Sequence, residues 1–319
     1  MIPLEEAQEE VLAACRPLAT GSVPVADALG LLLAEAIRSQ ESVPPFPNTA
    51  MDGYAVRSGD TATASPSTPA RLRVIGTLSA GRAPDRSVGP GEALRIMTGA
   101  PFPEGADTVA IVETTTVDGD EVLIVAPAGP GEHVRPAGSD IEAGQDLFPA
   151  GTVLGPGHLG VLCSVGCTEV VATRRPVVGV LSTGDELTEA PDPLGPGQIR
   201  DSNRRTLISL LRRDGFIPVD LGIARDDDVV IEGVLTEAAA SCDAVLTSGG
   251  VSMGDFDLVK AVLDRIGRMR WMQVAIRPAK PFAFGVVGRT PVFGLPGNPV
   301  SSMVSYEVLA RPGLRRMAG

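Results

Sequence analysis

Lysine, asparagine and histidine are almost missing from this chain of 319 residues. All but two of its 27 basic residues are arginine; the exceptions are Lys260 and Lys280, and the only asparagines are Asn48, Asn203 and Asn298. An ammonium and a guanidinium are not interchangeable at a tight oxyanion site, so a lysine retained in such a sequence marks a candidate functional position. The alternative, chance survival on the surface, stays open for each of the five residues taken alone.

Positive charge and long apolar runs are scarce as well. The formal net charge of −12 argues against nonspecific binding to nucleic acid or to an acidic membrane, so an anionic substrate needs a local cluster of basic residues. No apolar run approaches the roughly 20 residues that cross a bilayer, and the acidic N-terminus lacks the pattern of a signal peptide. We therefore expect a cytoplasmic protein that binds neither nucleic acid nor membrane.

Cysteine is also rare, and its four positions are scattered. Cys163 and Cys167 lie in a stretch of small and apolar residues with no pair of histidines nearby. This context favours buried structural thiols over a metal site.

The first half of the chain changes character twice. Residues 4–38 read as helical but broken around Gly21–Pro24, with Leu29, Leu33 and Ile37 four residues apart on one face. The prolines of residues 42–48 then predict an extended crossover rather than a helix. From residue 51 to about 134, short β-like runs are separated by glycine and proline, with a hairpin signal at residues 118–120. The expected strands of this β-rich part are residues 71–75, 93–97, 108–114 and 122–125.

From residue 175 onward, strands alternate with helices. The expected strands are residues 177–181, 217–221, 244–246, 270–276, 282–287 and 292–295; the expected helices are 204–213, 229–240, 258–266 and one from about Ser301. Such βαβ units predict a mostly parallel sheet covered on both faces. The fold class is therefore α/β multidomain. The expected domains are an elongated N-terminal linker domain of residues 1–45 with 135–172, a β-rich domain of residues 46–134 and an α/β domain of residues 173–319.

Three of the predicted strands of the α/β domain are followed by glycines and hydroxyl residues. These segments are residues 182–187, 247–254 and 296–302. Glycines let a backbone approach a ligand closely, hydroxyls can donate to oxyanions, and helix N-termini favour anions. Parallel sheets bind ligands beyond the carboxyl ends of their strands. One such segment reads as an ordinary tight turn, but three in one sheet predict a ligand cleft.

Charged and polar motifs surround this predicted cleft. Residues 200–203 precede a helix and read as its N-terminal cap, with a ligand role in addition. Residues 277–281 form a basic segment between two strands, whose prolines hold the cationic side chains at little entropic cost; the alternative is a solvated basic loop. Residues 48–54, 97–100 and 138–141 of the β-rich part each read alone as a turn, and nothing in their spacing joins them to the cleft.

These motifs, taken together and in this order, resemble the molybdopterin molybdenumtransferases. That family comprises bacterial molybdenum-insertion enzymes related to the E domain of gephyrin and its plant counterpart. The resemblance rests on residues 44–46 and 51–55, 95–101, 138–141, 182–187, 248–254 with Asp257 and Lys260, and 295–301. It covers essentially the whole chain, and the set of motifs is far more specific than any one of them.

The resemblance implies a fold, an activity and a set of ligands. The α/β domain would be MogA-like and would bind adenylylated molybdopterin and molybdate; molybdate would be inserted into the dithiolene and AMP released, with a divalent cation such as Mg²⁺. Family members are elongated homodimers whose cleft joins the α/β domain of one subunit to the β-rich domain of the other. A molybdopterin adenylyltransferase and molybdoenzyme apoproteins are further expected partners.

The resemblance also assigns roles to individual residues. The implied catalytic residues are Asp52, Thr98, Asp140, Glu186, Asp257 and Lys280, and the implied metal ligands are Asp226 and Asp257. The implied cofactor-binding residues are Thr183, Gly184, Asp185, Asp201, Ser202, Asn203, Ser248, Gly249, Gly250, Ser252, Gly254, Lys260, Arg277, Pro281, Pro296, Gly297, Asn298, Pro299 and Ser301. Carboxylates suit Mg²⁺, while cations, hydroxyls and turn amides suit oxyanions.

The chain departs from the family pattern in three places. Ala279 stands where the family usually has glycine, Ser139 alters the motif around Asp140, and the sequence stops at Gly319 before the small β-barrel domain expected in fourth place. The last departure supports an alternative function, that of a non-catalytic paralogue or scaffold that holds molybdopterin. A third reading, an α/β enzyme acting on another phosphorylated substrate, fits the glycine-rich segments but not the ordered set of motifs.

Overall fold

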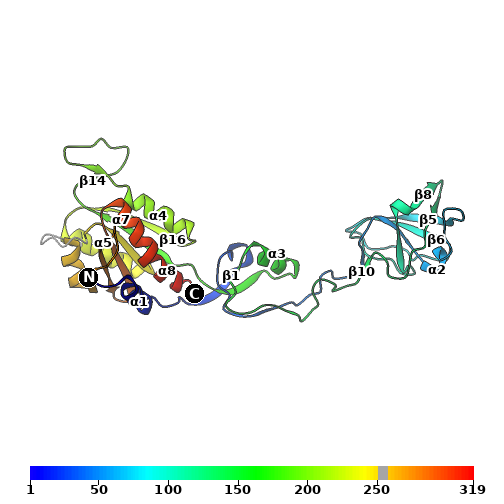
Figure 1. Ribbon diagram of the computed structural model, residues 1–319, viewed down its shortest axis with the longest axis horizontal. Helices are drawn as coiled ribbons and strands as arrows, with labels where there is room; N and C mark the ends of the chain where they lie inside the picture. The colour runs from blue at the N-terminus through cyan, green and yellow to red at the C-terminus, as the bar shows by residue number, and fades with distance from the viewer. Residues whose placement is uncertain (251–257) are drawn as a thin grey trace. The chain divides into compact units, whose positions relative to one another are not determined.

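The computed structural model describes residues 1–250 and 258–319, which form two compact units (Figure 1). The first, here called the α/β unit, comprises Met1–Glu35, Ala150–Leu159 and Glu169–Gly319. The second, the β unit, comprises Ala36–Pro149 and Gly160–Thr168. Among the described residues, no helix is long and apolar enough to cross a membrane.

A six-stranded sheet forms the centre of the α/β unit. In spatial order its strands are β16 (Ile217–Ala224), β13 (Val177–Thr183), β17 (Ala244–Ser248), β20 (Thr290–Leu295), β19 (Pro281–Val287) and β18 (Arg268–Gln273). The first four are parallel, and β19 runs antiparallel to both of its neighbours. The predicted mostly parallel α/β sheet is confirmed, and its carboxyl edge is the end at which β13, β17 and β20 stop.

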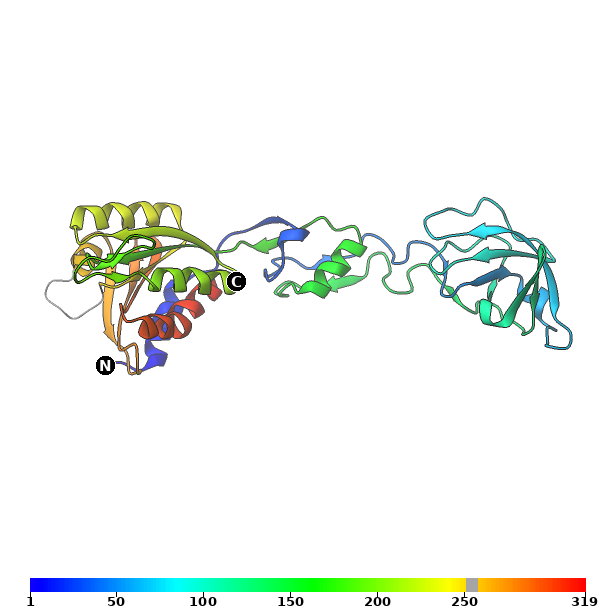
Figure 2. The ribbon, with the colours of Figure 1, turned by 90° about the horizontal axis from the view of Figure 1, so that it is seen from above.

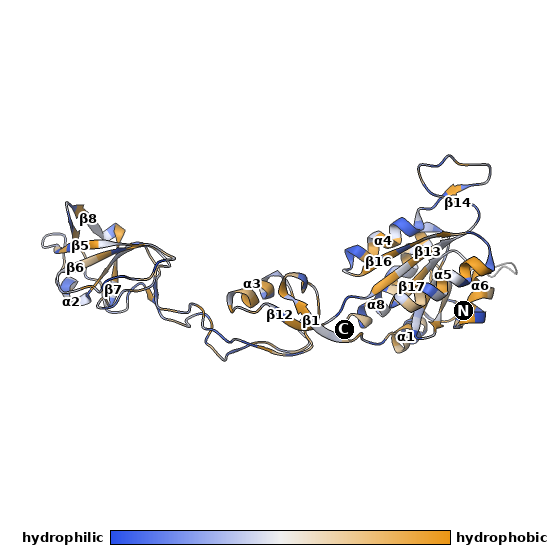
Figure 3. Cartoon of the chain, turned by 180° about the vertical axis from the view of Figure 1, so that it is seen from behind, coloured by the Kyte–Doolittle hydropathy of each residue, from blue (hydrophilic) through white to orange (hydrophobic). Residues whose placement is uncertain are grey.

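Helices cover both faces of this sheet (Figures 1 and 2). One face packs against α1 (Leu4–Ala14), α4 (Asn203–Arg213) and the C-terminal helices. The C-terminal helices are α7 (Pro299–Ser305), a π-helical turn (Tyr306–Ala310) and α8 (Arg311–Met317). The other packs against α5 (Asp228–Ser241) and α6 (Leu258–Ile266). Successive residues of a strand alternate between the faces: Ala244 and Leu246 join the first core, and Val245 joins the second. Accordingly, Figure 3 shows the strands largely in the hydrophobic colour.

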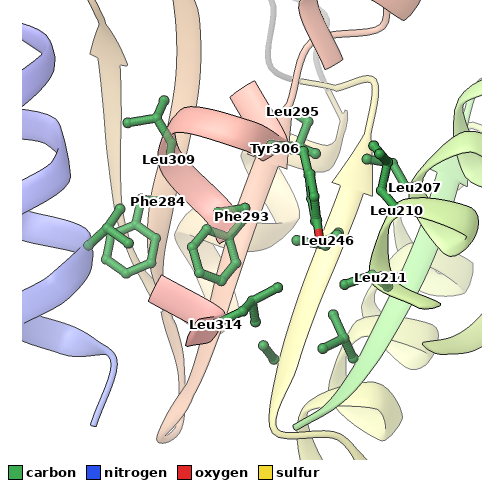
Figure 4. Packing of buried hydrophobic residues seen from close by; sticks show 14 of the residues in the cluster. Leu207, Leu210, Leu211, Leu246, Phe284, Phe293, Leu295, Tyr306, Leu309 and Leu314 are labelled. Atoms are coloured by element: carbon green, nitrogen blue, oxygen red, sulfur yellow. The ribbon is translucent and has the colours of Figure 1, made fainter. Parts of the chain in front are cut away.

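The core beneath α4 and the C-terminal helices is tightly packed (Figure 4). Phe293 of β20 is fully buried, and its ring centre lies 5.1 Å from that of Phe284 on β19. Tyr306 is also fully buried, and its hydroxyl donates a 2.8 Å hydrogen bond to Asp214. The satisfied hydroxyl lets a polar residue fill the space between the helices and the sheet.

The helix predicted at the start of residues 4–38 is confirmed as α1, and the predicted break around Gly21–Pro24 falls within a strand, but the helix predicted after this break is wrong. Residues Thr20–Pro24 form β1, which pairs antiparallel with β12 (Glu169–Thr173), and Leu33 forms an isolated bridge to Ala172. Gly30 adopts a positive φ of 79°, which ends any helical run there. The four-residue spacing of leucines was therefore misleading, because pairing with a distant strand overrides a weak helical pattern.

The expectation that Cys163 is a buried thiol is also wrong. It lies on α3 (Pro156–Ser164), where Leu162 is the one buried residue, and its side chain is exposed while Cys167 is half-buried. A short helix with a single buried position leaves its other small residues facing water.

The β unit contains the second six-stranded sheet. Its strands lie in the order β7 (Thr108–Ile111), β4 (Gly53–Val56), β6 (Glu92–Ile96), β5 (Ala70–Leu78), β9 (Glu121–Ile124) and β8 (Thr115–Asp118). The predicted hairpin at residues 118–120 joins β8 to β9 through Gly119, with φ of 65°. Short pairs, β2 (Ile37–Arg38) with β11 (Asp146–Phe148) and β3 (Asn48–Thr49) with β10 (Val134–Arg135), flank the sheet; α2 (Ser58–Thr61) is a single turn. The β-rich character of this part is thus confirmed.

An ion pair at the start of β13 gives a testable pH dependence. The side chain of Asp243 is 13% exposed; it pairs with Arg174 and accepts the Val177 N–H at 2.9 Å. Burial alone would raise the pKa of Asp243, but the bonds from Arg174 and Val177 outweigh it and hold this pKa below its ordinary value. Because the folded-state pKa is depressed, the stabilisation is present above the unfolded pKa and is lost as pH falls through the folded pKa.

We expect Asp243→Asn to lower the free energy of unfolding by about 2 kcal/mol at neutral pH, since hydrogen bonds to charged groups contribute about that much. The difference from wild type should be constant from about pH 5 to pH 8 and shrink below about pH 4, the ordinary range of an aspartate. Urea titrations at several pH values measure it. A difference that stays the same at pH 3 would show that the carboxylate charge is not the source.

Candidate functional site

A pocket opens at the carboxyl edge of the α/β sheet, where β13 stands between β16 and β17. The direction of strand connection reverses there, which is where open α/β sheets place ligands. The pocket takes residues from the ends of β13 and β17, from the turn after β20 and from the start of α4. Its lining is Ser182, Thr183, Glu186, Leu187, Ile199, Arg200, Asp201, Ser202, Asn203, Ser248, Gly249, Gly297 and Pro299.

One wall of the pocket is a small pair of parallel strands outside the main sheet. β14 (Leu187–Thr188) pairs with β15 (Ile199–Arg200), and the loop between them projects away from the sheet (Figure 1). The Ile199 N–H donates to the Glu186 carbonyl at 2.8 Å, and the Asp201 N–H donates to the Thr188 carbonyl at 3.2 Å. We call residues 186–188 and 199–201 the pocket wall. The projecting loop between them is not part of it.

Asn203 joins three segments of the chain at the pocket floor. Its Nδ2 donates 2.8 Å to the Ser248 hydroxyl and 2.7 Å to the Gly297 carbonyl. The Gly297 carbonyl can only accept, so the amide must present its nitrogen to it. Both amide hydrogens are therefore used inside the protein, and Oδ1 is the atom left to face a ligand.

The polar lining of the pocket combines carboxylates, hydroxyls, one amide and the arginine Arg200. Asp201 accepts a 3.0 Å hydrogen bond from the Ser182 hydroxyl, which is fully buried. Glu186 is exposed at the pocket mouth, and it reaches back over Gly184, where an added Cβ would lie 2.3 Å from its carboxylate. The exposed Glu186 carboxylate, the Asn203 Oδ1 and the Gly297 carbonyl suit a ligand part that carries N–H and O–H donors.

The basic segment of residues 277–281 lies at the same edge of the sheet. β19 pairs antiparallel with β20 in a register that sets Ala283 opposite Gly294, so the start of β19 lies beside the end of β20. Arg277 and Lys280 are exposed, and no side chain in the described ranges pairs with either of them. Neither residue lines the pocket. The edge therefore combines the polar pocket with two exposed cations outside it.

Several predicted residues flank the pocket without lining it. Asn298 caps α7, its Oδ1 accepting the Ser301 N–H at 3.2 Å, and Asp185 accepts the Asp226 N–H at 3.2 Å. The others in this group are Gly184, Gly250, Pro281 and Pro296. Ser252, Gly254 and Asp257 lie outside the described residues.

Lys260, the other rare lysine, has a partner away from the pocket. It lies on α6, and its ammonium is 5.5 Å from the centre of the Trp271 ring on β18. This is a cation–π contact. Lys280 is thus the lysine that faces solvent at the carboxyl edge, and the cofactor-binding role of Lys260 stays a prediction.

Two of the three predicted residues of the β unit, Asp52 and Thr98, are hydrogen-bonded to each other. Asp52 accepts hydrogen bonds from both the N–H and the hydroxyl of Thr98, each at 2.7 Å. These bonds, the hydroxyl first, hold the pKa of Asp52 below its ordinary value, so the carboxylate is charged at neutral pH. Asp140 is exposed in another loop of this unit, where its N–H donates to the Val43 carbonyl at 2.9 Å. Their part in one site with the α/β pocket stays a prediction.

Comparison with known proteins identifies the family. Residues 2–166 match the model of the MoeA N-terminal region (domain I and II), and residues 179–316 match a probable molybdopterin binding domain. Molybdopterin molybdenumtransferase 2 of Mycobacterium tuberculosis is 40% identical over 319 residues, covering 97% of this chain and 77% of that protein. The chain belongs to the molybdopterin molybdenumtransferase family. Molybdopterin molybdenumtransferase of Haemophilus influenzae is 38% identical, covering all of this chain and 78% of that protein.

Solved structures of molybdopterin molybdenumtransferase relatives agree with this assignment. The molybdopterin biosynthesis MoeA protein from Pyrococcus horikoshii is similar with a TM-score of 0.79 and 39% sequence identity, covering 99% of this chain and 81% of that one. A second structure of a MoeA protein from that organism has a TM-score of 0.78 and 30% identity. The expected family and fold are confirmed.

Ala279, where the resemblance implies a glycine, has a backbone conformation that favours glycine. Its φ is 81°, in the left-handed region, and its methyl group is buried. The left-handed conformation costs an L-residue roughly 1–2 kcal/mol. Glycine avoids this cost, but part of the gain in stability is lost because glycine also raises the conformational entropy of the unfolded chain. We expect Ala279→Gly to raise the free energy of unfolding by about 0.5–1 kcal/mol, measured by urea denaturation. Lower stability in the variant would mean that the buried methyl group outweighs the strain.

Sequence reasoning missed two features of this site. Ile199 and Arg200 enter the lining because β15 pairs with β14, and two-residue strands leave no periodic signal. Arg204 was read as an ordinary helical residue, yet its side chain is 2% exposed among carboxylates. The sequence did contain a signal: Arg204 and Arg205 are adjacent at the start of α4, and the next turn of this helix is largely apolar.

Proposed function

We propose that this chain is a molybdopterin molybdenumtransferase, which inserts molybdate into adenylylated molybdopterin and releases AMP. The observation that supports this most is the combination, at one sheet edge, of the polar pocket with the basic segment of Arg277 and Lys280. Relatives that carry the name molybdopterin molybdenumtransferase match nearly the whole chain. The proposal places the chain in molybdenum cofactor biosynthesis, in the cytoplasm.

The two parts of the edge suit different parts of such a substrate. Pterin and adenine rings carry amino and ring N–H groups, which match the Glu186 carboxylate, the Asn203 Oδ1 and the Gly297 carbonyl. Phosphate and molybdate carry oxyanions, which match the exposed cations of Arg277 and Lys280. In the proposed function a heterocycle enters the pocket, and the reacting oxyanions lie toward the basic segment.

Mg²⁺ fits the acidic residues near the end of β13. Asp185 and Asp226 are both exposed, and the Asp226 N–H donates a hydrogen bond to Asp185 Oδ1 at 3.2 Å. Among the residues described, neither carboxylate has an ion-pair partner. Mg²⁺ typically binds one or two protein carboxylates and completes its shell with water and substrate phosphates. We propose Asp226, with Asp257 of the undescribed segment, as its ligands. The ion would neutralise phosphate charge as AMP leaves.

The active form is proposed to be a homodimer. In it, Asp52, Thr98 and Asp140 of one subunit's β unit would complete the site of the other subunit. The Asp52 carboxylate, kept charged by Thr98, would then be available to orient a donor group of the substrate. Transfer from a molybdopterin adenylyltransferase, and onward to molybdoenzyme apoproteins, supplies the substrate and removes the product.

A stoichiometric assay tests the proposed function. Purified protein is mixed with adenylylated molybdopterin and Mg²⁺, with or without molybdate, and AMP release and protein-bound molybdenum are followed. We expect AMP release that requires molybdate and is abolished by EDTA. Tight binding of the pterin with no AMP release under any condition would instead identify a non-catalytic binding protein. Release that EDTA leaves unchanged would remove Mg²⁺ from the proposal.

A further inference from the structure

The guanidinium of Arg204 contacts three carboxylates with three different nitrogens. Its Nε donates to Asp201 Oδ2 at 2.8 Å and its Nη1 pairs with Asp220, while its Nη2 lies 2.8 Å from Glu189 Oε1 as an ion pair without hydrogen-bond geometry. The side chains of Arg204 and Asp201 are each 2% exposed. A guanidinium buried this deeply loses its hydration, and nearby carboxylates must offset that cost.

The three carboxylates belong to three different segments around the pocket. Asp201 follows β15 and lines the pocket, Glu189 follows β14, and Asp220 lies within β16 of the main sheet. β14 and β15 are two residues each, too short to hold a fixed position by their own pairing. Arg204 therefore links Asp201 at one end of the pocket wall, and Glu189 directly after β14, to the central sheet through one rigid planar group.

Arg204 also determines where the Asp201 carboxylate points. Asp201 Oδ1 accepts from the Ser182 hydroxyl at 3.0 Å and from the Arg204 N–H at 3.2 Å, while Oδ2 is held by the Arg204 side chain. The carboxylate is thus bonded on both oxygens inside the protein. Lysine could not reproduce this arrangement, because an ammonium offers no planar fork to contact separate carboxylates.

We propose that Arg204 is a positioning residue that holds the pocket wall and Asp201 in the geometry required for binding, and thereby sets the substrate affinity of the site. The link to affinity rests on the proposed function; the link to the geometry of the wall does not. The alternative is that Arg204 contributes to stability alone, in which case the wall and the affinity of the folded protein would not change with it.

Two variants separate these roles, and a neighbour provides a matched control. Glu189→Gln keeps size but removes the pair to Arg204 from a side chain that is 44% exposed, so the fold should persist. Arg204→Lys keeps the charge but loses the fork. Arg205→Gln is the control: Arg205 also pairs with Glu189 and contacts Asp220 at 3.5 Å, but its side chain is 62% exposed and has no bond to Asp201.

The first readout needs no ligand. Amide hydrogen exchange is measured at Ile199 and Asp201, whose N–H groups hold the wall together. We expect exchange at least 10-fold faster in Glu189→Gln and Arg204→Lys, and within 2-fold of wild type in Arg205→Gln. Unchanged exchange in the first two variants would overturn the proposal, as would equal acceleration in Arg205→Gln. This comparison stands even if the chain proves not to release AMP.

The second readout is affinity. We expect the Kd for adenylylated molybdopterin, measured by equilibrium titration below the unfolding temperature, to rise about 5-fold in Glu189→Gln and 10-fold or more in Arg204→Lys. The single-turnover rate at saturating substrate should stay within about 3-fold of wild type. A lower Tm with unchanged Kd would assign Arg204 a structural role alone. Absence of binding by wild type would count against the proposed function and leave the exchange result to decide the role of Arg204 in the wall.

Discussion

Lys280→Ala is expected to lower the rate of molybdate insertion by about 100-fold and to leave stability unchanged. The side chain is exposed at the carboxyl edge, and no residue of the described ranges forms an ion pair with it. Its removal therefore breaks no contact within the fold. Loss of one group that stabilises developing negative charge typically reduces the rate by a factor of 10² to 10³. The rate is measured as AMP release in a single turnover, and stability by thermal unfolding.

The control for Lys280 is a cation at the other end of the same strands. Arg289 is exposed in the turn that joins β19 to β20, at the opposite edge of the sheet from Lys280. Arg289→Ala should leave the rate within 2-fold of wild type. Lys280→Arg should be slower than wild type by about 10-fold although the charge is kept, because a planar guanidinium does not replace a compact ammonium at a tight oxyanion site. Full activity in Lys280→Arg would show that the site does not require a lysine at this position.

Asn203→Leu is expected to disrupt the pocket floor. The Ser248 hydroxyl and the Gly297 carbonyl would each lose a hydrogen-bond donor that leucine cannot supply. Unsatisfied groups of this kind destabilise a protein by about 1–3 kcal/mol each, so we expect the free energy of unfolding to fall by about 2–4 kcal/mol. Misplacement of three segments around a ligand should also lower kcat/KM by about 100-fold.

Thr206→Ala, one turn along α4, is the matched control for Asn203. The Thr206 hydroxyl donates to the Ser202 carbonyl at 2.9 Å within the same helix and lies outside the pocket. Its loss should change stability by no more than about 0.5 kcal/mol. If Asn203→Leu kept wild-type kcat/KM, Asn203 would be a local helix-start residue and the pocket floor would not depend on it.

The α/β unit could be predicted well because each of its elements carries a local signal. The expected helix at residues 258–266 coincides with α6, and the expected strands at 177–181 and 292–295 lie within β13 and β20. Buried strands of a parallel sheet are apolar throughout, and their helices have a clear apolar stripe. Residues 20–35 carried no such signal, because Thr20–Pro24 becomes a strand only by pairing with Glu169–Thr173, some 150 positions further along the chain.

The site was predictable to the extent that it is formed by strand ends. Thr183, Ser248 and Gly297 could be expected to meet, because the carboxyl ends of parallel strands lie at one edge. The pocket wall and the buried Arg204 could not, because ion pairs between distant segments depend on three-dimensional position and not on spacing. The sequence also indicated an anion site in the glycine-rich segments; the structure lines the pocket there with carboxylates, hydroxyls and Arg200, and places Arg277 and Lys280 at the same edge outside it.

The most direct test of the account is a crystal structure of this protein with AMP and molybdate bound. The account predicts a heterocycle among Glu186, Asp201 and Asn203 in the pocket, and molybdate oxygens within hydrogen-bonding distance of Lys280 Nζ. Ligands bound away from the carboxyl edge of the α/β sheet would contradict it, as would a phosphate or molybdate group seated among the carboxylates of the pocket.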